Sequence, residues 1–543
     1  MLIPVMRERF GWRRFPAGER ALLFRGHVAG RTPEILAREA ASLSRAAVPA
    51  WLDRLDGHFS LVLTGPDWSL AAVDPVRSYP LIWARREGAV LVASNGPALV
   101  RHLGLGPVDI DADQAAAFAL SGFTVGAATL YRGVRQLSPG KFILVEAGGE
   151  TTETSYHVWR PQRPDPVTPE ELVAPLAQLH EKLIGDLIVS AAGRPILVPL
   201  SAGLDSRMIA SGLAAAGYRN VQCFAYGRAG NREAVVSSEI ARRLGYPWRV
   251  VPYTNAVVRA SYESPDHQAY LAYADNLTAI PFPQDYPALD RMRRDGALDP
   301  DSILVNGQSG DFITGNHVPA ALFSPRDDGK AARLERILDA LVAKHFKNWT
   351  SLRTPKRMAG IKALLTVEID AAGGLPDDPA GDHGVYEASE FVDRQSKYVI
   401  NGQRVYEYLG LDWRLPLWDR AYIDFWARAP LAAKKGQNLY RQVLERENWG
   451  GVWRDVPVNP LRIRPLWLVP LRLAAKAAHA PLGQARWRRF EKQYLEYWMA
   501  PLCSYAPWSY RQVATDKRGH ASPIGWYIER YLAAKGPTWS GGL

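Results

Sequence analysis

The stretch Val198–Ala210, VPLSAGLDSRMIA, decides how the central part of this 543-residue chain folds. It continues the apolar run Ile196–Leu200, changes to the small and polar residues Ser201–Ser206, and then continues as a segment typical of a helix. A buried strand that ends in a small-residue loop before a helix is typical of a parallel α/β sheet. Ligands of such sheets bind at the carboxyl ends of the strands, where this loop lies.

Strands and helices alternate through the residues around this stretch. The predicted strands are 196–200, 221–227, 248–253 and 302–307, and the predicted helices are 171–189, 206–216 and 232–244. Alternation with helices of about a dozen residues favours a doubly wound parallel sheet. Beyond residue 332 the chain is expected to be mostly helical, so the predicted class is α/β with a helical C-terminal part.

The first 160 residues show a different pattern, in which turns separate short runs of β-forming residues. The predicted strands are 59–65, 68–74, 80–86, 89–95 and 138–149, and the predicted helices are 32–44 and 112–120. This pattern predicts an α+β domain in which sheet packs on sheet. The proline-rich, charged segment Arg160–Glu171 is typical of a linker, so we expect domains at 1–160, 161–455 and 456–543.

Composition excludes several classes of protein. The two cysteines, Cys223 and Cys503, rule out a disulfide framework and suit a reducing compartment. The N-terminus has no apolar core of signal-peptide length, and no apolar run is long enough to span a membrane, so a cytoplasmic location is expected. The net charge of +11 favours anionic ligands. We find no nucleic-acid-binding motif and no zinc-type spacing of Cys and His.

The loop Ser201–Ser206 has the composition of an anion site. Small residues let backbone N–H groups close around an anion, and the start of the following helix adds its positive dipole end. The carboxylate of Asp205 would repel a phosphate, but Mg²⁺ binds carboxylate and phosphate oxygens together. An ordinary helix cap is the alternative for this segment taken alone.

A second segment, Ile303–Asn316, repeats this arrangement: an apolar strand ends in Asn306, Gly307, Gln308, Ser309 and Gly310, and Asp311 follows. A glycine-rich turn with a capping aspartate is the alternative for this segment alone. Two strand ends, each with small residues and one aspartate, favour a single Mg²⁺–pyrophosphate site between them.

These residues carry a family resemblance. LSAGLDS resembles the SGGxDS pyrophosphate loop of N-type ATP pyrophosphatases, and with NGQSGDFITG and RLPLWDRAYIDFW (Arg414–Trp426) it resembles the synthetase domain of asparagine synthetases. β-Lactam synthetases and lasso-peptide cyclases belong to the same group. Two N-terminal segments, Leu55–Trp83 and Thr129–Glu146, resemble the glutamine-amidotransferase domain of these enzymes, which implies a sandwich of the Ntn-hydrolase type.

The resemblance implies a ligase that uses ATP and Mg²⁺ to activate a carboxylate as its adenylate and then forms an amide with a nitrogen nucleophile. Asp205 and Asp311 would hold the metal. The residues implied to bind ATP and pyrophosphate are Leu200, Ser201, Gly203, Leu204, Asp205, Ser206, Tyr226, Asn306, Gly307, Ser309 and Gly310.

The sequence departs from the family pattern at several positions. A glutaminase needs a cysteine directly after Met1, and Leu2 stands there, so we expect no glutaminase activity. Ala202 replaces a loop glycine, and Phe312 replaces an acidic residue. The family also places a lysine in a late loop. The candidates for its role are Arg462 and Arg464 of the segment Val458–Pro465, with Lys434 and Lys435.

We therefore expect an amide-forming ligase whose acceptor is aspartate or an acidic sugar such as a uronic acid. Its nitrogen would come from ammonia, from a separate glutaminase or biosynthetic partner, or from an amine substrate. Two alternatives stay open: an intramolecular cyclase, and a catalytically silent nucleotide-binding partner. A cyclising Tyr/Glu pair is disfavoured because Tyr406 and Glu407 are adjacent and would point apart on a helix.

The C-terminal segment 466–498 mixes Trp and Leu with Arg and Lys. It is expected to pack on the synthetase domain or to lie on an acidic membrane surface or an acidic partner. A homodimer is also compatible with the sequence.

Overall fold

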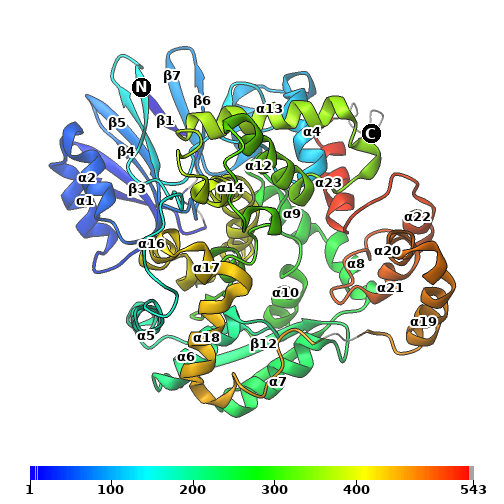
Figure 1. Cartoon of the computed structure of the whole chain (residues 1–543). Helices are drawn as coiled ribbons and strands as arrows, with labels where there is room; N and C mark the ends of the chain where they lie inside the picture. The colour runs from blue at the N-terminus through cyan, green and yellow to red at the C-terminus, as the bar shows by residue number, and fades with distance from the viewer. Residues whose placement is uncertain (7, 9, 461–462, 537–543) are drawn as a thin grey trace.

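The computed structural model describes residues 1–6, 8, 10–460 and 463–536 (Figure 1). Three sheets organise it: two in the N-terminal part and one in the centre. The N-terminal strands are β1 (Leu2–Pro4), β2 (Arg13–Ala17), β3 (Arg20–Val28), β4 (Gly57–Thr64), β5 (Trp68–Val73), β6 (Ile82–Arg86), β7 (Ala89–Ala93), β8 (Val134–Gln136), β9 (Lys141–Glu146) and β10 (Thr151–Ser155).

The N-terminal strands form a sandwich. One sheet has the order β1-β7-β6-β8 and the other the order β10-β9-β5-β4-β3-β2. Apolar side chains from both sheets, among them Leu2, Val62 and Trp83, form one buried layer. Helices α1 (Pro33–Ala41) and α2 (Val48–Asp53) share a second apolar cluster with the six-stranded sheet. This arrangement confirms the predicted α+β sandwich.

The central sheet is parallel throughout, with the order β13-β12-β11-β14-β15. Its strands are β11 (Ile196–Pro199), β12 (Val221–Gly227), β13 (Trp248–Pro252), β14 (Ile303–Val305) and β15 (Asp412–Arg414). The alternating helices include α5 (Val173–Ala191), α6 (Asp205–Ala215) and α7 (Arg232–Leu244). The predicted doubly wound sheet is confirmed, and β11 lies between β12 and β14. The loops after β11 and β14 therefore open at the same edge of the sheet.

Further helices lie between the later strands of the sheet and after its last strand. They are α8 (Asn255–Glu263), α9 (Pro265–Ala274), α10 (Tyr286–Arg294), α11 (Gly310–Ile313), α12 (Lys330–His345), α13 (Pro355–Ala371), α14 (Asp382–Glu390), α15 (Arg404–Tyr408), α16 (Arg420–Arg428), α17 (Leu431–Lys434) and α18 (Asn438–Glu447). Helices α3 (Gly96–Leu103) and α4 (Ala112–Ser121) belong to the N-terminal part.

The C-terminal extension is helical, as predicted, and has two parts with different surroundings. Helices α19 (Leu468–His479) and α20 (Gln484–Phe490) lie at the outer edge of the molecule (Figure 1). After α21 (Glu496–Met499) and α22 (Tyr510–Thr515), α23 (Ile524–Ala533) packs against α4 of the N-terminal domain. Its residues Trp526 and Ile528 are buried in a cluster that joins all three parts of the chain.

Shortening a buried side chain of α23 tests whether the extension is part of the core. Ile528 is fully buried, so Ile528→Ala should lower the free energy of unfolding by about 2–5 kcal/mol. Val367→Ala is the matched control, because Val367 on α13 is 64% exposed and its loss should change stability by less than about 0.5 kcal/mol. Urea unfolding measures both. Equal stability of the two variants would show that α23 does not belong to the core.

Candidate functional site

The loop between β11 and α6 is ordered by its own hydroxyl groups. The backbone N–H of Ser201 donates to Oγ of Ser206 at 2.9 Å, and the N–H of Gly203 donates to Oγ of Ser201 at 3.1 Å. The two hydroxyl oxygens lie 3.0 Å apart. Both serines therefore face the inside of the loop, which folds back over the start of α6 with Asp205 as that helix's first residue.

The second loop lies directly on Asp205. A Cβ atom at Gly310 would lie 2.4 Å from both Cγ and Oδ1 of Asp205, and one at Gly307 would lie 2.7 Å from the Asp205 carbonyl carbon. No side chain fits in either place. The backbone N–H of Asp311 donates to Oδ2 of Asp205 at 3.1 Å. The two glycines therefore let the ends of β11 and β14 approach closely enough to bring both aspartates together.

The two carboxylates perturb each other. Burial, and then the charge of Asp311, raise the pKa of Asp205 to about 8. Burial alone would also raise the pKa of Asp311, but a hydrogen bond from His317 and the positive charges of His317 and Arg394 hold it below its usual value. One proton on this pair is thus favoured at neutral pH, which is the behaviour expected of two carboxylates placed to share a cation.

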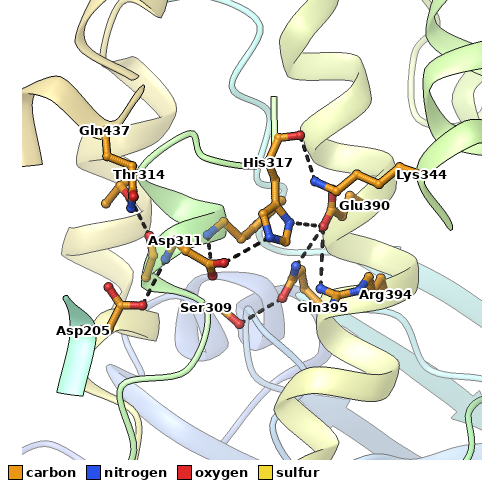
Figure 2. A network of polar contacts seen from close by, with 12 residues as sticks. Asp205, Ser309, Asp311, Thr314, His317, Lys344, Glu390, Arg394, Gln395 and Gln437 are labelled. Carbon is orange, nitrogen blue, oxygen red and sulfur yellow. Dashed lines mark hydrogen bonds and ion pairs between the residues drawn. The ribbon is translucent and has the colours of Figure 1, made fainter. Parts of the chain in front are cut away.

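A chain of polar groups extends from the half-exposed Asp311 into the protein interior (Figure 2). Nε2 of His317 lies 3.2 Å from Oδ2 of Asp311, and its Nδ1 pairs with Glu390 at the end of α14. Burial alone would lower the pKa of His317, but its two carboxylate partners raise it. Burial alone would raise the pKa of Glu390, but His345 and His317 hold it well below its usual value. The two carboxylates thus favour the charged form of His317, which orients Asp311.

Glu390 has further partners that connect it to the second loop. The side-chain amide of Gln395 donates to Glu390 at 2.9 Å and accepts from the hydroxyl of Ser309, also at 2.9 Å. The ammonium of Lys344 lies 3.6 Å from the Glu390 carboxylate and donates to the backbone carbonyl of His317 at 2.9 Å. The loop that carries Asp311 is therefore held at both ends by one buried carboxylate.

The residues at this point suit Mg²⁺. Oδ1 of Asp205 is buried and makes no hydrogen bond of ordinary geometry among the described residues, although the buried Tyr440 hydroxyl lies near enough to this carboxyl to lower its pKa. A cation would supply the missing partner, and carboxylate oxygens combined with phosphate oxygens are the ligands that Mg²⁺ prefers. Among the described residues no cluster of three or more His, Cys, Asp and Glu side chains has a metal-binding arrangement, so phosphate or water would complete the ligand set.

A cavity of about 450 Å³ lies beside the first loop, at the carboxyl ends of β11 and β12. Leu200, Ser201 and Tyr226, three of the predicted nucleotide-binding residues, line it. The hydroxyl of Tyr226 donates to Asp285, which also accepts from Tyr406 at 2.6 Å. Asn306 donates to the Tyr406 hydroxyl at 2.8 Å. This network links the cavity wall to the second loop.

The C-terminal extension closes the same cavity. Its residues on the wall are Glu496, Ala500, Pro501, Leu502, Ser504, Pro523, Ile524 and Tyr527. Arg228, just after β12, holds this segment, because its backbone N–H donates to the carbonyl of Pro501 at 2.7 Å and its guanidinium to that of Ala500 at 3.0 Å. We did not expect the extension at the site, since a pocket wall made by such a segment has no motif.

The late segment passes beside the first loop. The buried guanidinium of Arg207 donates to the carbonyls of Ala202, Val452, Val456 and Pro457. The N–H of Asn459 also donates to the carbonyl of Ala202, at 3.1 Å. Arg464 donates to the carbonyl of Gly230, and the predicted Arg462 lies outside the described residues. The late segment therefore lies near the loop Ser201–Ser206, and the guanidinium of Arg464 is bound to a backbone carbonyl.

The two candidate lysines differ. Lys434 is fully buried, and its ammonium donates to both carboxylate oxygens of Glu387 at 2.9 and 3.1 Å. This ion pair commits Lys434 to the interior. Lys435 is exposed, and two residues beyond it the amide of Gln437 donates to Thr314 at 2.7 Å, directly after α11. Lys435 thus lies on the chain near the second loop, and its catalytic role stays a prediction.

Three residues of the site were missed because they belong to no motif. They are His317, Glu390 and Arg207. His317 lies 6 positions from Asp311 and 73 from Glu390, and Arg207, next to the first loop, reaches the carbonyl of Val456, 249 positions away. A fourth is Glu233, which accepts from the N–H of Ala202 at 2.5 Å. His317 had one signal, since it follows the second motif directly in the sequence.

Comparisons with known proteins give two family matches. Residues 41–157 match the glutamine amidotransferase domain, and residues 189–447 match asparagine synthase. Among proteins with curated functions, none matches the chain.

Two solved structures are similar to parts of the chain. The allosteric regulatory enzyme of purine biosynthesis is 13% identical with a TM-score of 0.20, over 44% of this chain and 61% of that one. The glutamine phosphoribosylpyrophosphate amidotransferase from B. subtilis, complexed with ADP and GMP, is 12% identical with a TM-score of 0.20, over 55% of this chain and 64% of that one. The chain thus spans less than two thirds of either structure, and similarities this low carry no argument about function.

The contact between the loops can be tested with a single methyl group. Gly310→Ala places a Cβ against the Asp205 carboxylate and should destabilise the protein by about 1–3 kcal/mol. Gly360→Ala is the control, because a Cβ at Gly360 on α13 meets nothing within 4 Å and should stabilise the helix by about 0.5–1 kcal/mol. Thermal unfolding distinguishes the two. A Gly310→Ala variant as stable as the wild type would contradict the close approach.

Proposed function

The chain belongs to the asparagine synthetase family, and we propose that it is an amide-forming ligase that uses ATP and Mg²⁺ and does not hydrolyse glutamine itself. Its two domains support an ATP-dependent, amidotransferase-type ligase. The observation that carries the proposal is the convergence of Asp205 and Asp311 at the ends of neighbouring strands, beside the first turn of α6.

In the first step the acceptor is activated. An oxygen of the acceptor carboxylate forms a bond to the α-phosphorus of ATP, the bond from that phosphorus to the bridging oxygen breaks, and pyrophosphate leaves. Asp205 and Asp311 would hold Mg²⁺, which neutralises charge on the leaving pyrophosphate. The loop Ser201–Ser206 and the start of α6 would donate hydrogen bonds to its oxygens.

In the second step the amide forms. The lone pair of ammonia or an amine attacks the acyl carbon, the bond from that carbon to the AMP oxygen breaks, and the nitrogen loses a proton. AMP and the amide are the products. The cavity beside Leu200 and Tyr226 is proposed to hold the adenosine part of ATP and of the adenylate. Its closure by the extension would keep water from the adenylate.

The loss of glutaminase chemistry is supported by the surroundings of the residues concerned. Leu2 is 3% exposed in the apolar layer between the two N-terminal sheets. Cys223 and Cys503 are unpaired and fully buried. Burial raises the pKa of Cys223 to about 12 and also raises that of Cys503, so neither forms a thiolate nucleophile near neutral pH. Free ammonia, a separate glutaminase or an amine substrate would supply the nitrogen.

Intermolecular amide formation is favoured over cyclisation. The hydroxyl of Tyr406 donates to Asp285, whereas Glu407 accepts from Tyr273 at 2.6 Å. The two side chains therefore have separate partners and form no acid–base pair for an internal amine. The acceptor proposed is aspartate or a uronic acid. The location proposed is the cytoplasm, a reducing compartment that would suit two unpaired cysteines.

Pyrophosphate release across a panel of acids tests this function. ATP and Mg²⁺ are supplied with aspartate, uronic acids or acidic peptides, each with glutamine, with ammonium or with neither. We expect release that needs one acid and increases with ammonium but not with glutamine. Release that rises with glutamine would contradict the proposed loss of glutaminase activity. Release from an amine-bearing acid alone would contradict the intermolecular reaction.

The variant Asp205→Asn should reduce this release at least about a hundredfold, because it removes a charge that holds the metal at the leaving group. Asp377→Asn is the matched control, since the side chain of Asp377 is fully exposed, and it should leave the rate unchanged. An Asp205→Asn enzyme with the wild-type rate would rule out the proposed role of Asp205.

Metal binding should depend on pH in a defined direction. The pKa of Asp205 is about 8 without metal, so this carboxyl carries a proton at neutral pH that Mg²⁺ must displace. Calorimetry with a non-hydrolysable ATP analogue should show affinity for Mg²⁺ that rises by up to about tenfold per pH unit below 8 and then levels off. The metal–nucleotide equilibrium in buffer is subtracted. Affinity that is constant between pH 6 and pH 8 would contradict the shared proton.

A further inference from the structure

The helical hairpin formed by α19 and α20 exposes an unusual amount of apolar surface. Among its residues, Leu471 and Leu473 are 56% and 57% exposed, and Leu466 and Trp467 just before α19 are 65% and 55% exposed. Leu482 in the turn is 49% exposed. Five large apolar side chains in 17 residues thus face solvent, which is the densest such group along the described chain.

The exposed face of α19 carries no charge. Its buried or half-buried positions are Leu468, Val469, Arg472, Ala475 and His479, which repeat at helical spacing and face the rest of the protein. The exposed positions on the other side are Pro470, Leu471, Leu473, Ala474, Ala477 and Ala478, and Lys476 lies at the margin. This is the pattern of an amphipathic helix whose apolar face points away from the protein core.

Contacts between α19 and α20 hold the hairpin in shape without any partner. Trp487 of α20 is 7% exposed, and the guanidinium of Arg472 on α19 lies 5.6 Å above its ring. Arg472 also pairs with Glu491 at 2.5 Å. The rings of His479 and Phe490 lie 4.4 Å apart. The apolar face is therefore presented on a rigid support and not produced by a missing contact within the hairpin.

The charges in the hairpin and just after it are almost all positive. Residues 466–490 contain no Asp or Glu, and between 466 and 492 there are six basic residues and one acidic residue. Lys476, Arg486, Arg488 and Arg489 are exposed, and no ion pair involves any of them in the described part of the chain. The one acidic residue, Glu491, is already paired with Arg472.

We propose that this hairpin docks the protein on an anionic membrane surface, with Trp467, Leu471, Leu473 and Leu482 inserted among the lipids and the basic residues on acidic headgroups. Exposed apolar side chains flanked by Lys and Arg, with a Trp at the boundary, are the composition of interfacial helices. A second copy of the chain fits less well, because it would bring two acid-free basic hairpins together. Docking would be peripheral, since no helix in the described residues has the length and apolarity to cross a bilayer.

Docking would place lipid close to the proposed active site. Only the helical turn Glu491–Leu495 separates α20 from α21, and Glu496 at the start of α21 already lines the cavity. The membrane-bound hairpin is thus continuous with one wall of that cavity. The docking proposal itself does not rest on the enzymatic function and is tested without measuring activity.

Co-sedimentation of the full chain with vesicles tests the proposal. The protein should bind vesicles of phosphatidylcholine mixed with phosphatidylglycerol, bind phosphatidylcholine alone much more weakly, and dissociate as salt is added. Leu471→Ser combined with Leu473→Ser should weaken binding by about tenfold or more. Arg488→Ser combined with Arg489→Ser should weaken it by about fivefold for each charge. All four positions are exposed, so these variants should fold.

Val367→Ser is the control, because Val367 is equally exposed on another helix and should leave vesicle binding unchanged. Wild-type protein that stays in solution with the anionic vesicles would overturn the proposal, as would a double leucine variant that binds like the wild type. Sedimentation velocity tests whether a second copy of the chain, and not a membrane, covers this face. A dimer that the leucine changes convert to monomer would assign this face to a second copy and would also overturn the proposal.

Discussion

The contact of two glycines with one aspartate, Gly307 on its backbone and Gly310 on its carboxylate, sets the geometry of the whole site. Gly307 and Gly310 pack on Asp205 with no room for a Cβ, so β11 and β14 end at a fixed spacing and Asp311 lies next to Asp205. The parallel order of β12, β11 and β14 places the cavity on the other side of the same loop. The positions of the proposed metal ligands, the proposed pyrophosphate loop and the proposed nucleotide cavity thus follow from one backbone approach.

The surrounding groups keep the two aspartates unequal. His317 stabilises the charged form of Asp311, whereas burial and the charge of Asp311 raise the pKa of Asp205 more than the Asp311 N–H and the Tyr440 hydroxyl lower it. A site of this kind is ready for a cation and unfavourable without one. Phe312, where the resemblance implies an acidic residue, is buried, and the buried carboxylate of Glu390 contacts Asp311 only through His317. Glu390 comes from α14, far from the motif in sequence.

The sheet and both loops could be predicted because their signals are local. Residues 221–227 and 232–244 match the bounds of β12 and α7, since apolar periodicity and the Asn231 cap determine them. Strands β3 and β15 were not expected, because β3 has no clear alternation and β15 is only three residues long. Lys434 was a catalytic candidate by position, yet it is buried with Glu387, a partner 47 residues away. Pairings of this range and the cavity wall at Ala500–Ser504 depend on tertiary packing that no local pattern encodes.

The most direct test of this account is a crystal structure with Mn²⁺ and a non-hydrolysable ATP analogue, in which anomalous scattering locates the metal. The account predicts a metal peak between the carboxylates of Asp205 and Asp311, with the phosphates against residues 201–206 and the adenine in the cavity beside Tyr226. A nucleotide bound instead in the separate cavity lined by His27, His58 and Arg414 would contradict it, as would a metal away from both aspartates.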